Sequence, residues 1–199
     1  LPGASDDVSL VGASAGTVVS ISSVQSVNSI SVSGANVTGL SIESTGDFTI
    51  PTAFSNPLPI TVEGTLSVSG NLTAASEITV NGILSVTGDL TASSDITVDG
   101  DLSVTGDATV SSDMTVDGTL SVGGDLIANS DITVEGTVTV TGNLTAASTI
   151  IVKNAASVTV SSDITVSDTV TVMTGGSLSS TGDISITSTG TISSDGPVS

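Results

Sequence analysis

The side chains of this sequence that could carry chemistry are carboxylates, and many of them recur at a spacing of 18 residues. Hard cations take oxygen ligands, so carboxylates stacked from repeat to repeat could hold Ca²⁺ between them. The candidate ligands are Asp89, Asp107 and Asp125 in one column and Asp95, Asp113 and Asp131 in a second column. Neither column has the glycine-rich nonapeptide of calcium-binding solenoids. A solvated, aggregation-resistant acidic surface is the alternative interpretation.

Other chemistry is poorly represented. The chain has no Cys nucleophile, no His base and no Tyr acid, and Lys153 is its single basic residue. Paired carboxylates can hydrolyse glycosides, but these acids recur with the repeat instead of forming one distinctive pair. The aromatic or basic groups that would hold a sugar are also missing. We therefore predict that the protein is not an enzyme and uses no cofactor, with Ca²⁺ as the one candidate to test.

The charge balance excludes two classes of partner. Twenty acids against one base give a net charge of −19. Phosphate backbones and anionic lipid surfaces would both be repelled by such a chain. No run of 18 or more apolar residues occurs, so the sequence predicts no membrane insertion. We expect the chain itself, rather than a nucleic acid or a bilayer, to be the partner.

The positions of these acids are set by an internal repeat. Five units of 18 residues begin at Ile60, Ile78, Ile96, Met114 and Ile132 and follow one another without insertion. Each unit divides into three hexads, in which an aliphatic residue stands first, Val or Ala usually stands third, and a small residue stands fifth. The fifth residues are predicted corners: Gly64, Gly82, Gly100, Gly118 and Gly136, then Gly70, Gly88, Gly106, Gly124 and Gly142, then Ser76, Ser94, Ser112, Ser130 and Ser148.

The hexad spacing predicts a fold. The first and third residues of a hexad lie on the same face of a short strand, because side chains alternate with a period of two. Gly or Ser then permits a tight bend at a crowded corner. Three strands and three bends close one triangular coil, and coils stack at about 4.8 Å. The predicted fold class is an all-β, three-sided parallel β-helix, a solenoid with 18 residues per coil and undetermined handedness. An antiparallel sandwich explains the alternation but not the six-residue phase.

Regularity varies along the chain. We expect an N-terminal arm at residues 1–20, irregular coils or a cap containing Pro and Phe at 21–59, regular repeats at 60–149 and less regular coils at 150–199. In the last segment, intervals of eight residues fall at 173–176 and 187–190 and indicate enlarged corners.

These repeats resemble known solenoids. The coil of three hexads is similar to left-handed hexapeptide-repeat β-helices, and the string VTGDLT resembles bactofilin-type polymers. That family's fold is a right-handed triangular β-helix joined end to end. Strings such as VTGNLT also occur in repetitive phage-fibre proteins. The resemblance is strong over residues 60–150 and weak over 150–195. Hexapeptide acyltransferases are expected to use a histidine base, which this chain lacks.

The two ends of the solenoid carry the functional hypothesis. Each end of a β-helix presents unpaired backbone donors and acceptors, and a contact between unlike ends that does not close gives a filament. We predict a structural subunit of an extracellular or cell-surface filament, assembled head to tail through the β-helix ends, with an N-terminal strand as an additional candidate contact. A binding module such as a phage fibre, an adhesin or an ice-binding β-helix is the alternative, because outward ranks of Ser and Thr are also expected.

Overall fold

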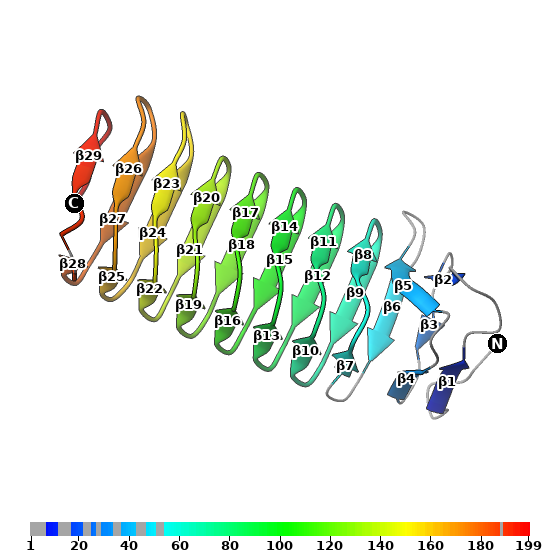
Figure 1. The fold of residues 1–199 in the computed structure, drawn as a ribbon. Coiled ribbons are helices and arrows are strands. Elements are labelled where there is room, and N and C mark those ends of the chain that lie inside the picture. Colours follow the sequence, from blue (N-terminus) through cyan, green and yellow to red (C-terminus); the bar gives the residue numbers. More distant parts are fainter. Residues whose placement is uncertain are drawn as a thin grey trace.

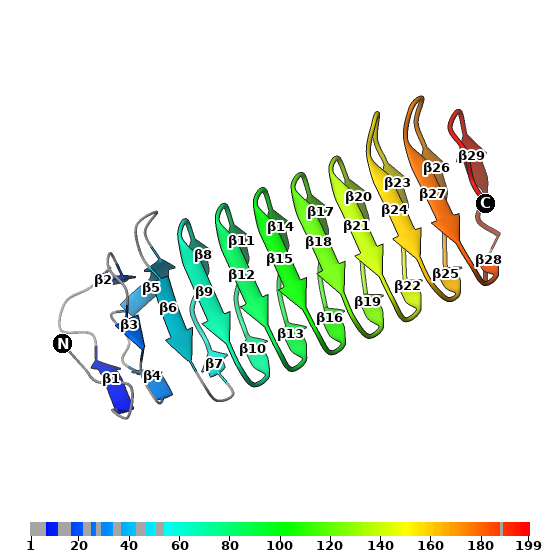
Figure 2. The ribbon, with the colours of Figure 1, turned by 180° about the vertical axis from the view of Figure 1, so that it is seen from behind.

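Parallel strands stacked into a rod make up the whole described structure. The computed structural model describes residues 7–11, 17–21, 25–26, 29–33, 37–42, 47–50, 54–187 and 189–199, and within them there are strands and turns but no helix. The N-terminal strands lie at one end of the rod and the C-terminus at the other (Figures 1 and 2). The fold class is therefore confirmed as a three-sheet parallel β-solenoid with about 18 residues per turn.

Three parallel sheets form the sides of the rod, and we call them the first, second and third wall. The first wall contains β2 (Thr17–Ile21), β5 (Val37–Ile42), β8 (Ile60–Val62), β11 (Ile78–Val80), β14 (Ile96–Val98), β17 (Met114–Val116), β20 (Ile132–Val134), β23 (Ile150–Val152), β26 (Val170–Val172) and β29 (Ile192–Ser194). The second wall contains β3 (Gln25–Ser26), β6 (Asp47–Ile50), β9 (Thr65–Val68), β12 (Ile83–Val86), β15 (Asp101–Val104), β18 (Thr119–Val122), β21 (Thr137–Val140), β24 (Ser157–Val160) and β27 (Ser177–Ser180).

The third wall is shorter than the other two. It contains β7 (Phe54–Asn56), β10 (Leu72–Ala74), β13 (Leu90–Ala92), β16 (Ala108–Val110), β19 (Leu126–Ala128), β22 (Leu144–Ala146), β25 (Ile164–Val166) and β28 (Ile184–Ile186). Two further strands, β1 (Asp7–Val11) and β4 (Ser29–Ser33), pair only with each other among the described residues. The third wall thus ends at β7, whereas the first and second walls continue toward the N-terminus.

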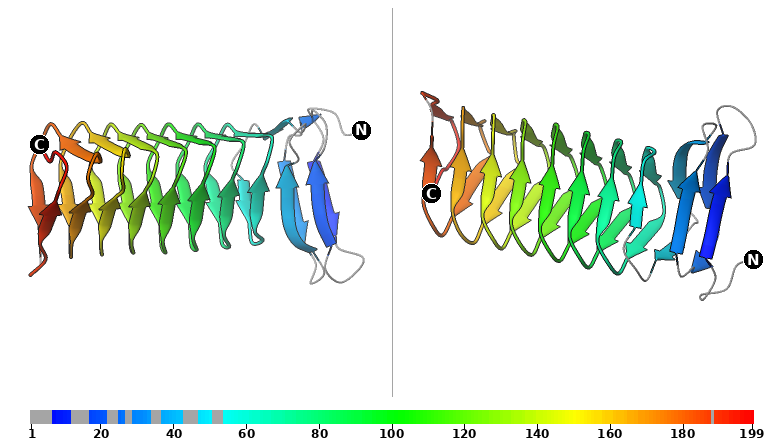
Figure 3. Two further views of the ribbon diagram at one scale, coloured as in Figure 1. Left: turned by 90° about the horizontal axis from the view of Figure 1, so that it is seen from above. Right: turned by 60° about the horizontal axis from the view of Figure 1, so that its bottom comes forward.

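The register follows from the repeat. In each wall of the regular part, a residue pairs with the residue 18 positions later, as in Ile78 with Ile96 and Leu84 with Leu102. Inward positions are buried, with Ile, Leu, Val and Ala side chains no more than 2% exposed. Each buried aliphatic side chain contributes roughly 1.5–3 kcal/mol. The coils are evenly stacked along the rod (Figure 3), so these side chains form one continuous narrow core.

One wall shows how the core keeps its volume. In the third wall, Leu90 and Ala92 point inward in one coil, and Ala108 and Val110 occupy the same two columns in the next coil. The smaller side chain in one column is thus offset by a larger one in the other. Volume-conserving exchanges of this kind are the best tolerated core changes.

Enlarged corners interrupt the 18-residue period toward the C-terminus. From β21 onward, paired residues are 20 apart, as in Ile150 with Val170. β26 pairs with β29 at a spacing of 22, because the intervals from Val170 to Leu178 and from Ile184 to Ile192 are each eight residues long. The predicted enlargement at 173–176 is a turn in the structure. A second turn, at 153–156, accounts for the eight residues from Ile150 to Val158 and was not predicted.

The backbone conformation of these two turns predicts how substitutions there will change stability. Ala155 has φ of 63°, and Gly175, twenty residues later in the equivalent turn, has φ of 82°. The left-handed region costs an L-residue with a Cβ about 1–2 kcal/mol. We expect Ala155→Gly to raise the free energy of unfolding by about 0.5–1 kcal/mol after the greater flexibility of glycine in the unfolded chain is counted. Gly175→Ala should lower it in chemical denaturation, and a lower stability of Ala155→Gly would contradict the prediction.

The division into four segments remains a prediction. Backbone ladders cross each expected boundary, because β2 pairs with β5, β7 with β10, and β20 with β23. Phe48 and Phe54 pair with Leu66 and Leu72, and the packing of their side chains lies outside the described residues.

Candidate functional site

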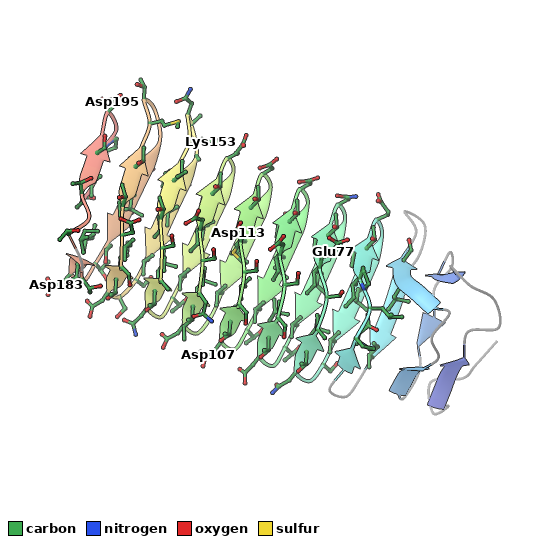
Figure 4. All side chains as sticks on the ribbon, viewed as in Figure 1. Glu77, Asp107, Asp113, Lys153, Asp183 and Asp195 are labelled. Carbon is green, nitrogen blue, oxygen red and sulfur yellow. The ribbon has the colours of Figure 1, made fainter. Side chains whose placement is uncertain are left out.

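The three corners of the rod carry most of its acids, and the acids of the first corner make different contacts from those of the other two. The first corner joins the first wall to the second, the second corner joins the second wall to the third, and the third corner returns to the first wall. Figure 4 shows Asp107 and Asp183 along one corner and Lys153 and Asp195 along another. The predicted Gly and Ser columns all lie in the bends between strands.

Side chains of the second corner form a hydrogen-bonded ladder along the rod. The amide of Asp107 donates to Asp89 Oδ1 over 3.0 Å, and the amide of Asp125 donates to Asp107 Oδ1 over 2.8 Å. Each side chain therefore accepts the backbone N–H of the same residue in the following coil. We call this set the Asx ladder, and its members are Asn71, Asp89, Asp107, Asp125, Asn143, Asp163 and Asp183.

The glycine before each acid makes room for this contact. A Cβ on Gly106 would lie 2.2 Å from Asp89 Oδ1, and one on Gly124 would lie 2.0 Å from Asp107 Oδ1. Glycine and Asx therefore act as a pair, in which the glycine of one coil leaves space for the side chain of the coil before it. At the same corner Ser162 replaces glycine, and its hydroxyl donates to Asn143 Oδ1 over 2.8 Å.

The Asx ladder predicts a difference between two substitutions. Asp107→Ala removes the acceptor of the Asp125 amide, and we expect a loss of about 1 kcal/mol because the exposed corner lets water replace part of the bond. Asp107→Asn keeps an Oδ1 acceptor, as Asn71 and Asn143 do in the native column, and should cost little. Chemical denaturation of both variants tests this. Equal losses for alanine and asparagine would exclude the acceptor role.

The third corner uses its aspartates in the same way. The amides of Asp113, Asp131 and Thr149 donate to the carboxylates of the preceding coil over 3.2, 3.3 and 3.0 Å. All six candidate metal ligands thus accept a backbone N–H from the next coil. Sequence reasoning missed this role. The sequence does contain a signal for this role: Asp and Asn occupy equivalent positions of the Asx ladder, and both side chains present an Oδ1 acceptor.

At the first corner the backbone amides donate to backbone carbonyls instead of to acidic side chains. The Val62 carbonyl accepts both the Asn81 and the Gly82 amides over 2.8 Å, so no side chain is needed as acceptor. The side chains pair with one another instead: Asn81 Nδ2 donates to Glu63 Oε1 over 2.7 Å, and Lys153 forms an ion pair with Glu135. These exposed contacts contribute little, since surface ion pairs are typically worth less than about 1 kcal/mol.

Metal binding gains no support from the geometry. Among the residues that the structure describes, no group of three or more His, Cys, Asp or Glu side chains is arranged to hold a metal ion. The calcium hypothesis stays a prediction, which calorimetric titration with Ca²⁺ tests directly. Within the same residues there is also no helix long and apolar enough to cross a membrane.

The outward surface of the walls is made largely of hydroxyl side chains. In the first wall the middle residue of successive strands is Thr79, Thr97 and Thr115, each half-buried between its neighbours in the ladder. Exposed large apolar side chains are scattered along the rod, with Ile83 44% and Ile127 37% exposed. Single exposed apolar residues are normal on a protein surface.

The last described coil differs from the coils beneath it. Ile192 of β29 is 47% exposed, whereas Val170, its partner in the preceding coil, is fully buried. Ile184, Ile186 and Val198 are only partly buried against the core. On one side, residues 197–199 extend over β27, with Leu178 donating to the Pro197 carbonyl over 3.1 Å. At this end of the described chain, the apolar side chains of the core are therefore only partly covered.

The protein is therefore a β-solenoid of stacked parallel coils, with polar walls and an apolar core that is partly exposed at one end. The model of the Bactofilin family, described as polymer-forming and cytoskeletal, matches residues 59–161. Because this span is just over half of the 199 residues, the chain belongs to the bactofilin family. The resemblance seen in the repeats is confirmed. Comparison with curated proteins and with solved structures gave no match.

The family corrects one expectation. An extracellular or cell-surface location was predicted for this acidic filament subunit, and this prediction was wrong, because the family is cytoskeletal and a cytoskeletal polymer lies inside the cell. The physical reason for the error is that acidity provides solubility in any aqueous compartment. Net charge therefore reports on solubility and association and carries no information about location.

Proposed function

We propose that this chain is a structural, non-catalytic subunit of a cytoskeletal homopolymer and that its subunits join through the ends of their coils. Family membership supports a polymer-forming subunit. The main observation in favour of an end-to-end contact is that Ile192, in the C-terminal coil, is 47% exposed, whereas its equivalent in the preceding coil, Val170, is buried. Covering that apolar area with a second copy of the chain would favour association through the hydrophobic effect.

Backbone geometry supports the same contact. The outer edges of β28 and β29 have no further strand beside them among the described residues. Exposed strand edges readily pair with other strands. A head-to-tail contact would continue the walls in parallel from one subunit into the next, and repetition of such a contact gives an open filament.

Electron microscopy and one substitution test the proposal. The full chain should form filaments, and Ile192→Asp should abolish them by placing a charge in the contact. Ile127→Asp is the matched control, because Ile127 is also exposed but lies on a wall, and it should leave filaments intact. Ten strands stacked at about 4.8 Å make a rod about 45 Å long. Discrete rods of that length at every protein concentration would refute the proposal.

The orientation of the contact is tested separately. The chain has no cysteine, so Ser193→Cys introduces one thiol on the exposed β29. In a tail-to-tail contact two copies of this thiol would meet, and oxidation would produce disulfide dimers within filaments. In the head-to-tail arrangement they stay apart. Efficient dimer formation would therefore reject the head-to-tail orientation while leaving end-to-end assembly in place.

A further inference from the structure

The junction between the N-terminal coils and the regular body combines a broken wall with a buried polar side chain. We call the described strands β1 to β6 the N-terminal cap and residues 54–187 the body. The cap continues two walls, through Leu40 paired with Ile60 and Ile50 paired with Val68. In the third wall, β4 lies near β7, yet among the described residues it pairs only with β1. One of the three walls is therefore open at this junction.

Asn56 lies in the core at the same place. It is 1% exposed and occupies the column that Ala74 and Ala92 fill in the next two coils. Its Nδ2 donates to the Leu58 carbonyl over 2.8 Å, whereas its Oδ1 is buried without a hydrogen-bond partner. A buried acceptor without a donor destabilises the state that buries it. Opening the junction would hydrate this oxygen, so Asn56 favours the open state.

Two further features coincide with the junction. Pro57 follows Asn56 directly and Pro59 stands two residues further on, and proline has no N–H to donate to a neighbouring strand. The coils are also less regular within the cap, because Gln25 of β3 pairs with Phe48 at a spacing of 23, whereas residues of β6 pair with β9 across the junction at a spacing of 18. The family match begins at residue 59, beside the same junction. The match covers residues 59–161, which all lie within the body, and the cap lies outside the matched span.

From these observations we propose that the N-terminal cap is an autoinhibitory element that covers one end of the body and opens at the Asn56 junction. Opening frees the edges of β8 and β9, which pair with β5 and β6 in the closed state, and together with the edge of β7 they then form the surface for a second copy of the chain. This inference rests on the proposed end-to-end assembly and adds its regulation. Leu40 and Ile50, both 1% exposed, hold the cap closed, and the open third wall with Asn56 makes the closure weak.

Hydrogen exchange on the full chain tests the opening itself. Amides of β5 and β6 should exchange together and faster than those of β11 to β22, because they open as one unit. Asn56→Ala removes the buried acceptor and should slow exchange in β5 and β6 by about tenfold. Asn129→Ala, at an exposed corner, is the matched control and should leave the rate unchanged. Since any solenoid end frays, unchanged exchange of β5 and β6 in Asn56→Ala would overturn the role of the junction.

A disulfide lock tests the inhibition. Ser41 and Thr61 are paired residues of β5 and β8, so Ser41→Cys with Thr61→Cys ties the cap to the body under oxidising conditions. The oxidised lock should assemble at least about tenfold more slowly than the reduced protein, as expected if binding needs the open state. Thr97→Cys with Thr115→Cys makes the same link within the body and should have no effect. Equal assembly of the oxidised and reduced lock would overturn autoinhibition. If no variant formed filaments, the proposed function would fail, while hydrogen exchange would still decide whether the cap opens.

Discussion

Replacing Gly100 by alanine should lower the free energy of unfolding by about 3 kcal/mol, among the largest effects of any single substitution in this chain. A Cβ at this position would lie 2.1 Å from the Gly82 carbonyl oxygen and 2.5 Å from that of Asn81. Both atoms belong to the backbone of the preceding coil. The Gly82 carbonyl is also held in place by the Asp101 amide, which donates to it over 2.8 Å. Relief would require the two coils to move apart and break the ladders between them.

A matched glycine shows why the first corner is the more demanding one. Gly106, at the second corner, would bring its Cβ closest to Asp89 Oδ1, which belongs to a side chain that can rotate away, and its nearest backbone atom, the Gly88 carbonyl oxygen, would lie at 2.8 Å instead of the 2.1 Å found at Gly100. We expect Gly106→Ala to cost about 1–2 kcal/mol. Denaturant melts of the two variants measure the difference. Equal losses would show that the clash with the backbone is relieved as readily as the clash with the side chain.

Leu102→Ala is expected to cost about 3 kcal/mol by leaving a cavity in the core. Leu102 is 1% exposed and stacks between Leu84 and Leu120. The ladders on either side hold the coils at a fixed spacing, so the cavity cannot collapse. Ser103→Ala, on the outward side of the same strand, should change stability by less than about 0.5 kcal/mol.

The third wall supplies the internal comparison for this cavity. Ala108 occurs naturally in a leucine column, and Val110 compensates for it two residues later. Leu102 has no such compensation, because Val104 already occupies the neighbouring column, where Val86 precedes it. A loss for Leu102→Ala below about 1 kcal/mol would mean that the rod can contract around a missing side chain.

The regular body could be predicted because one period determines strand, corner and core together. Ile60, Ile78 and Ile96 mark both the start of each coil and a column of paired residues in the first wall. The six-residue phase therefore leaves one arrangement that buries the first and third residues of every hexad. The same reasoning loses strength where the period changes. The turn containing Ala155 was missed because an alanine, unlike a glycine, gives no local signal of a left-handed backbone.

The roles of the acids could not be predicted from position alone. The spacing correctly places Asp89 and Asp107 in one column, but a column of carboxylates is equally compatible with solvent, a cation or a backbone donor. The distinction depends on how the chain turns at each corner. At the second corner the Asp107 amide finds its acceptor in a side chain, whereas at the first corner the Asn81 amide finds a carbonyl. Likewise, no pattern in the sequence shows that Asn56 is buried without a partner.

The equivalence of successive coils has a consequence for the evolution of length. In the regular repeats at 60–149, a residue and its partner in the next coil are separated by 18 positions, and the Asx ladder repeats at that interval. Removing residues 96–113 would join Asp95 to Met114 and bring together surfaces that already match. The rod would become shorter by one step of about 4.8 Å. Duplication of the same DNA segment would lengthen the rod by one step. The length of the protein can therefore change during evolution in units of one coil.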